Sequence, residues 1–94
     1  MTDWSVYMIR CSDDSLYTGI TTDVARRFSE HQSGTVGSKY LRGRAPLELV
    51  LERQVGGRSL ASKIEHRIKK LPRPEKETLL SLPSILDDLI LEVS

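Results

Sequence analysis

The sequence is poor in cysteine and in aromatic residues, and it contains no asparagine and no long apolar run. Its one cysteine, Cys11, excludes an internal disulfide framework and a zinc site built from several cysteines. No apolar run approaches the ~20 residues that a membrane-spanning helix needs, and the charged start MTDWS lacks the features of a signal peptide. At 94 residues the chain is long enough for one domain and too short for two. We therefore expect one soluble, cytoplasmic domain that does not contact a membrane.

Charges of the two signs nearly balance, with a formal net charge of +1, but they occupy different parts of the chain. The segment 26–76 holds thirteen of the fourteen basic residues and only five of the thirteen acidic ones. A basic middle between acidic ends fits a protein that binds a polyanion such as nucleic acid through one face. Ordinary solvated lysines and arginines explain the same pattern, and charge alone does not separate the two interpretations.

Two strands are predicted near the N-terminus. Residues 4–9 (WSVYMI) and 16–20 (LYTGI) alternate as strands do. The intervening 12–15 (SDDS) consists of short polar side chains that bond their own backbone in turns, so the strands are expected to form a hairpin. Tyr7 and Tyr17 share a face of this hairpin if odd residues pair with odd residues, a register that the sequence leaves open.

A helix is predicted over 23–33. Asp23 or the preceding threonine can cap its first turn, and Gly34 can adopt the left-handed conformation that ends a helix. Arg27 and His31 are four residues apart, so they share a face of this helix just beyond the second strand. A phenol, a guanidinium and an imidazole are therefore expected to converge.

The segment 34–46 (GTVGSKYLRGRAP) is expected to be an exposed, mobile, basic loop, because it holds three glycines, one proline and three basic residues. Its tyrosine is a candidate for stacking on bases, and its cations are candidates for phosphate contacts. The residues that we assign to nucleic-acid binding are Lys39, Tyr40, Arg42 and Arg44 of this loop, with Lys69 and Lys76 further along the chain.

The second half of the chain predicts one more strand followed by helices. Leucines alternate with other residues over 47–52, and this strand is expected to end near Gly56. Ser59 can cap a second helix that is stopped by Pro72, and a short third helix then reaches Leu82. Beyond Pro83 the tail fits either another amphipathic helix or a strand.

The expected order is β-β-α-β-α-α, which is an α/β fold of the α+β type. It has a small three-stranded antiparallel sheet flanked by helices. We expect one domain over 2–80 and a C-terminal tail, 81–94, that packs on it.

Two tripeptides and three helix positions, taken in order, form a family pattern. Val6-Tyr7-Met8 and Tyr17-Thr18-Gly19 lie about ten residues apart on the two strands, Arg27 and His31 follow on the helix, and Glu65 lies in SKIEHRIKKL. This ordered set, which spans about Trp4 to Leu80, resembles the GIY-YIG nuclease superfamily. It is most similar to the small stand-alone bacterial members of the UPF0213 type. The resemblance implies the GIY-YIG fold and a site that hydrolyses phosphodiester bonds.

The resemblance also implies a role for each position. One signature tyrosine would accept the proton of the attacking water; we assign this role to Tyr7, with Tyr17 in support, although the two could be exchanged. Arg27 would hold a phosphate oxygen, and His31 would orient a tyrosine or pass on a proton. Glu65 would bind Mg²⁺ or Mn²⁺ together with water and substrate phosphate.

Gly19 is assigned a structural role, either to let the chain pass from strand to helix or to let a phosphate approach the backbone. The site residues also have ordinary explanations. The tyrosines can be core residues with wet hydroxyls, Arg27 can be solvated, His31 can interact with the helix C-terminus, and Glu65 can pair with Lys69.

The chain departs from the family pattern at three points. Ser5 replaces the glycine of the first tripeptide, and the polar residue that relatives place near the last helix, often asparagine, has only Lys76 as a counterpart. The large specificity domains of many relatives are missing, so target choice is expected to come from this domain or from a protein partner.

The sequence thus predicts a divalent-metal-dependent endonuclease that acts on DNA, in repair or processing. Two alternatives belong to other classes: a nucleic-acid-binding module that kept the fold and lost turnover, and a protein-interaction domain. The basic excess in the middle of the chain disfavours the last of these.

Overall fold

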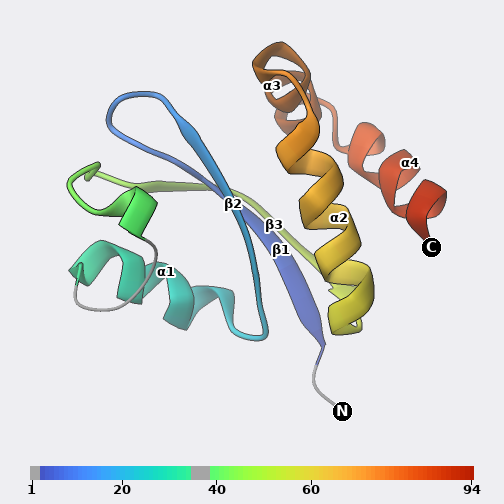
Figure 1. Cartoon of the computed structure of the whole chain (residues 1–94), viewed down its shortest axis with the longest axis horizontal. Coiled ribbons are helices and arrows are strands. Elements are labelled where there is room, and N and C mark those ends of the chain that lie inside the picture. The colour runs from blue at the N-terminus through green and yellow to red at the C-terminus, as the bar shows by residue number, and fades with distance from the viewer. Residues whose placement is uncertain (1–2, 35–38) are drawn as a thin grey trace.

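The computed structural model describes residues 3–34 and 39–94, and the side chain of Lys39 lies outside the described set. Its centre is a three-stranded antiparallel sheet in the order β2-β1-β3 (Figure 1). The strands are β1 (Trp4–Arg10), β2 (Leu16–Thr21) and β3 (Glu48–Gly56). The predicted α+β fold with a small antiparallel sheet is therefore confirmed.

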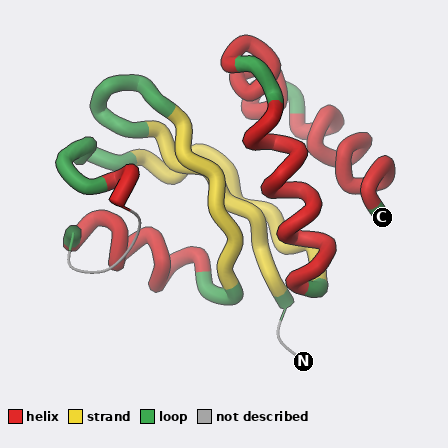
Figure 2. The backbone as a smooth tube through the Cα atoms, in the orientation of Figure 1, coloured by secondary structure: helices red, strands yellow, loops and turns green. Residues whose placement is uncertain are grey.

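The strand β1 is central and is covered on both faces. Its residues Val6, Tyr7, Met8 and Ile9 are all buried. Figure 2 shows helices on both sides of the strands. On one side lie α2 (Arg58–Lys70), α3 (Arg73–Ser81) and α4 (Pro83–Val93), and on the other lies α1 (Val24–Ser33).

Strand alternation divides the buried residues into two clusters. Val6 and Met8 pack in the larger cluster with the apolar stripe of α2, which includes Ile64 and Ile68. Tyr7 and Ile9 belong to the smaller cluster on the opposite face. Their partners there come from the end of β1, from α1 and from the segment before β3, and they are Cys11, Val24, Leu41 and Leu47.

The register of the hairpin pairs odd residues with odd residues. Tyr7 lies opposite Gly19, and Ile9 lies opposite Tyr17. Side chains of directly opposed residues in an antiparallel pair point to the same face. Tyr7 and Tyr17 therefore share a face, as the alternation allowed.

Both ends of α1 follow the sequence signals, whereas in α2 only the end does: α2 stops at Lys70, just before Pro72. The carboxylate of Asp23 accepts the backbone N–H of Arg26 at 3.1 Å, and Gly34 ends the helix in the left-handed conformation with φ 74°. The predicted cap of α2 at Ser59 is wrong. Gly57 is the N-cap residue, in an extended conformation with no side-chain cap, so Ser59 already lies in the first turn.

The tail forms the helix α4, which decides between the two alternatives for residues beyond 83 and adds a third helix after β3. Leu86 and Leu89 of α4 are buried in the same cluster as the stripe of α2. The division of the chain into a domain 2–80 and a tail stays a prediction.

Among the described helices, none is long and apolar enough to cross a membrane.

The described part of the predicted mobile loop is anchored. The short 3₁₀ helix η1 (Lys39–Leu41) buries Leu41, which is 3% exposed. The backbone N–H of Ser12 donates to the carbonyl of Arg44 at 2.9 Å, and a cis bond joins Ala45 to Pro46. The described part of the segment is therefore held to the rest of the domain by burial and by a backbone hydrogen bond. Residues 35–38 lie outside the described set.

Candidate active site

A buried hydrogen bond joins Tyr7 to His31. The hydroxyl oxygen of Tyr7 lies 3.0 Å from Nε2 of His31, and the two side chains are 1% and 5% exposed. Tyr7 comes from the centre of β1 and His31 from the last turn of α1, so this contact ties the helix to the sheet. The expected convergence of phenol and imidazole is present.

Aromatic rings continue from this pair toward the surface. The ring of Tyr17 lies 6.2 Å from that of Tyr7 and 5.5 Å from that of His31, between centroids. The next ring is Tyr40, at 5.9 Å from Tyr17, and the guanidinium of Arg44 lies 4.3 Å from the centre of the Tyr40 ring. A row of aromatic rings therefore leads from the buried hydroxyl of Tyr7 to the partly buried cation of Arg44.

Gly19 has a function in this arrangement that its sequence position did not reveal. A Cβ atom at Gly19 would lie 2.5 Å from the hydroxyl oxygen of Tyr7 and 2.6 Å from its Cζ, distances at which something must shift. Because Gly19 faces Tyr7 in the register of the hairpin, only glycine leaves room for the phenol there. The structure thus gives Gly19 a direct packing role against Tyr7, and the two roles assigned from sequence stay predictions.

Electrostatics make the Tyr7–His31 pair neutral near pH 7. Burial raises the pKa of Tyr7, the neighbouring Tyr17 adds to the rise, and the Arg27 guanidinium opposes it. Burial also lowers the pKa of His31 from its ordinary value, and the charge of Arg27 lowers it further. A neutral imidazole has one accepting nitrogen, so Nε2 can accept the hydroxyl hydrogen of Tyr7 when Nδ1 carries the ring hydrogen.

Arg27 lies at the border between this pair and solvent. Its side chain is 32% exposed, and its Nη1 donates to the carboxylate of Glu30 at 3.1 Å. Burial alone would lower the pKa of Arg27, but hydrogen bonding to Glu30 and to Tyr7 raises it. Arg27 is therefore a permanent cation beside the phenol, and it retains exposed surface through which it can reach a ligand.

Glu65 lies apart from the phenols. It belongs to α2, which packs against the face of β1 that carries Val6 and Met8, whereas Tyr7 is on the other face. Its side chain is 21% exposed, and its carboxylate pairs with the ammonium of Lys69 at 3.3 Å. The helix also contacts β2, which is an edge strand of the sheet.

The part of the chain that the structure describes contains no group of three or more His, Cys, Asp or Glu residues that could hold a metal ion. Glu65 therefore fits only an ion that takes most of its ligands from water and substrate. Mg²⁺ is such an ion, because it dehydrates reluctantly and is commonly held by one or two carboxylates together with phosphate.

The residues assigned to nucleic-acid binding differ in their exposure and in the partners that they already have. Tyr40 is 42% exposed and Arg42 is exposed, but Arg44 is engaged on three sides. Its guanidinium covers Tyr40, donates to the carbonyl of Tyr40 at 2.6 Å and pairs with Asp13. The remaining assigned cations are Lys69, paired with Glu65; Lys76, partly buried; and Lys39, whose side chain lies outside the described set.

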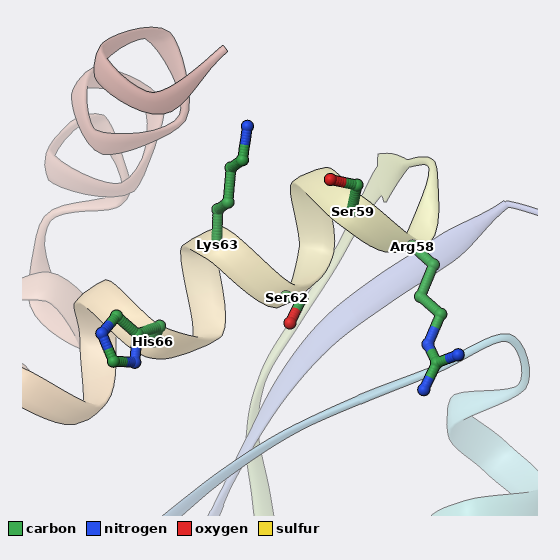
Figure 3. A pocket seen from close by; sticks show the side chains of 5 residues that line it. All are labelled: Arg58, Ser59, Ser62, Lys63 and His66. Carbon is green, nitrogen blue, oxygen red and sulfur yellow. The ribbon is translucent and has the colours of Figure 1, made fainter.

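Three features escaped the sequence reasoning. Glu30 orients Arg27, and the spacing of three residues on one helix was a usable signal for this pair. Asp13 holds Arg44 across thirty-one residues, for which no local signal exists. The third feature is an open hollow of about 600 Å³ on α2, seen in Figure 3 and lined by Arg58, Ser59, Ser62, Lys63 and His66.

Comparison with known proteins assigns the chain to a family. The GIY-YIG catalytic domain matches residues 3–78, which include Tyr7, Tyr17, Arg27, His31 and Glu65. The chain therefore belongs to the GIY-YIG family, a family of nucleases. This membership implies a nucleic-acid substrate and, as is general in these nucleases, the use of a divalent metal ion.

Relatives within the family place the chain more closely. It is 51% identical over 90 residues to the UPF0213 protein YhbQ of Salmonella arizonae, covering 96% of this chain and 89% of the relative. A UPF0213 protein of Citrobacter koseri is 56% identical over 81 residues, or 86% of this chain and 80% of that one. The chain is thus of the UPF0213 type.

Two solved structures share the fold. The solution NMR structure of a UPF0213 protein from Bacillus halodurans matches with a TM-score of 0.56 and 44% identity, covering 84% of this chain and 83% of that one. A solution NMR structure of a protein from E. faecalis matches with a TM-score of 0.61 and 40% identity, covering 86% and 85%. Their names state no activity, so the reaction has to be argued from the site.

Proposed function

We propose that this protein is a divalent-metal-dependent endonuclease that hydrolyses phosphodiester bonds in DNA, acting in DNA repair or processing in the bacterial cytoplasm. One observation supports the proposal above the others. The hydroxyl of Tyr7, at the first signature position of a nuclease family, is hydrogen-bonded to a neutral imidazole and lies beside an arginine. This arrangement can move a proton and offset negative charge at one place.

Tyr7 cannot act as a base alone, because burial raises the pKa of its hydroxyl and keeps it protonated near pH 7. His31 supplies the missing acceptor. As the water oxygen bonds to phosphorus, the water proton passes to the oxygen of Tyr7 while the phenolic proton passes to Nε2 of His31. The bond from phosphorus to the departing oxygen then breaks, and this oxygen takes a proton from solvent water. The imidazolium returns its proton to the oxygen of Tyr7 as Tyr7 releases the water proton to solvent, which restores the starting state.

Arg27 and Tyr17 complete the handling of charge in this scheme. The planar fork of Arg27 suits a non-bridging phosphate oxygen, where negative charge builds up during the displacement. Tyr17 packs beside both Tyr7 and His31 and so holds the pair in position. Because the two rings are adjacent, Tyr17 could instead be the tyrosine that accepts the proton, with Tyr7 in support.

Glu65 is the residue that would hold Mg²⁺ or Mn²⁺. When bound there, the ion would stabilise negative charge on the phosphate and on the departing oxygen. The ammonium nitrogen of Lys69 lies 3.3 Å from a carboxylate oxygen of Glu65, so metal binding would have to displace or rearrange this ion pair.

A second candidate function is a nucleic-acid-binding module without turnover. The same ion pair favours it, because a carboxylate held by lysine is a weaker metal ligand than a free one. Some of the basic residues of the segment 26–76 would serve binding in either case.

The test is nicking of supercoiled plasmid with Mg²⁺ or Mn²⁺, with EDTA and heat-treated protein as controls. We expect nicking with metal and none with EDTA. Glu65→Gln should abolish nicking with an unchanged melting temperature, whereas Glu75→Gln, an exposed glutamate of α3, serves as the matched control. Metal-independent nicking would contradict the role of Glu65, and binding without nicking would favour the module.

A further inference from the structure

The open hollow on α2 has the chemistry of a phosphate site. Arg58 and Lys63 bring two cations, Ser59 and Ser62 bring two hydroxyls, and His66 brings an imidazole. All five side chains are exposed, and no carboxylate is among the described residues that line the hollow. Donors of this kind match the oxygens of a phosphodiester.

Arg58 is held in place at one end of the hollow. Its guanidinium lies 5.4 Å from the centre of the Trp4 ring, within reach of a cation–π interaction. In Figure 3, Arg58 and Ser62 extend to one side of the helix, and Ser59 and Lys63 extend to the other. Fixing the guanidinium on an aromatic ring lowers the entropy that it would lose on binding a ligand.

One side of the hollow is aligned with Glu65. Arg58, Ser62, Glu65 and Lys69 are separated by four, three and four residues, so they lie along one side of α2. At about 1.5 Å per residue, Arg58 is about 10 Å from Glu65 along the helix axis. A strand of B-form DNA advances about 3.4 Å per nucleotide, so this length corresponds to about three nucleotides.

We infer that the hollow on α2 binds the phosphates of a nucleic-acid strand about three nucleotides from the phosphate at Glu65. The inference rests on the proposed function and extends it, because it defines a substrate that must be longer than the diester that reacts. Its donors span two turns of an exposed helix face, about 12 Å from Arg58 to His66. A single inorganic phosphate cannot contact both ends, whereas a strand can.

The experiment measures binding of a fluorescein-labelled 20-base-pair DNA duplex by anisotropy, in EDTA, as a function of salt. Each phosphate contact contributes roughly 0.9 to the slope of log affinity against log salt. Arg58→Gln and Lys63→Gln should each lower the slope by about this amount. Between about 50 and 200 mM salt, the wild type should therefore weaken about 3.5-fold more than either variant.

Arg53→Gln is the matched control. It removes one positive charge at the other edge of the sheet, on β3, where Arg53 pairs with Asp87 of α4. We expect this variant to keep the wild-type slope. Thermal unfolding of all variants shows whether loss of the Arg58 contact with Trp4 has altered the fold, and Lys63→Gln does not touch that contact.

Two further measurements separate the possible failures. Inorganic phosphate at matched ionic strength should displace the duplex no better than chloride; specific displacement that Lys63→Gln removes would instead indicate a small-anion site and overturn the inference. An unchanged slope in both hollow variants would also overturn it, even with nicking intact. Because EDTA prevents metal-dependent cleavage, reduced slopes support the strand site even if plasmid nicking fails.

Discussion

The two faces of β1 hold cores of different kinds. On the face of Val6 and Met8, three helices contribute aliphatic side chains, including Ile64 and Ile68. On the face of Tyr7, one helix and one loop close over a phenol that is hydrogen-bonded to a buried imidazole.

Under the proposed function, one strand serves stability on one face and chemistry on the other. Burial of aliphatic side chains stabilises the folded state whatever their relative orientation. A buried phenol and imidazole instead need a defined geometry, because a buried polar group without its hydrogen-bond partner costs free energy. Substitutions on the face of Val6 and Met8 should therefore change mainly the free energy of unfolding. Substitutions on the face of Tyr7 should change mainly the turnover.

Tyr7→Phe should give the largest effect. It removes only the hydroxyl to which we assign the proton transfer, and general acid–base catalysis is worth about 10²- to 10⁴-fold in rate. We expect kcat for plasmid nicking to fall by this factor, while duplex affinity in EDTA stays within about twofold. A fall in affinity with unchanged kcat would assign Tyr7 to binding instead.

Ile68→Ala probes the apolar face. The side chain is fully buried, and truncation of a buried isoleucine costs about 2–5 kcal/mol through lost burial and the cavity left behind. We expect urea denaturation to show this loss, with nicking per folded molecule unchanged at temperatures below the transition. Loss of nicking in fully folded protein would show that the two faces are coupled.

Gly19→Ala changes the packing on the face of β1 that carries Tyr7. The added methyl would meet the Tyr7 hydroxyl, and such overpacking costs typically about 1–3 kcal/mol. Because the ring must also move away from His31, we expect kcat to fall as well. In a double-mutant cycle with Tyr7→Phe the losses in kcat should not add, since both act on one hydroxyl; full additivity would separate Gly19 from Tyr7.

The pH dependence tests the neutral state of His31. Because its pKa in the folded protein is lower than in the unfolded chain, its contribution to stability is complete above the ordinary value of about 6.5 and is lost as pH falls through the folded value. We expect nicking to persist at pH 6.5 and to decline below it. An NMR titration of the imidazole that gave a raised pKa would contradict this assignment.

Much of the local structure could be predicted from the sequence, because its signals act over four residues or fewer. Alternation in 4–9 and 16–20 gave the hairpin, and Asp23 and Gly34 gave the limits of α1. The family pattern added the candidates for the site positions. The cap at Ser59 was predicted wrongly because Gly57, in an extended conformation, starts the helix two residues earlier.

By itself, then, the sequence determined the three strands and the helices up to Leu82, the shared face of Arg27 and His31, and the family, whereas the helical state of the tail came from the structure. Only the tertiary structure decided that Nε2 of His31 meets Tyr7, that Gly19 makes room for this phenol and that α2 places Glu65 on the other side of the sheet. The reason is physical: periodicity and capping are local interactions, whereas burial and the pKa shifts it causes depend on segments that meet only after the chain has folded.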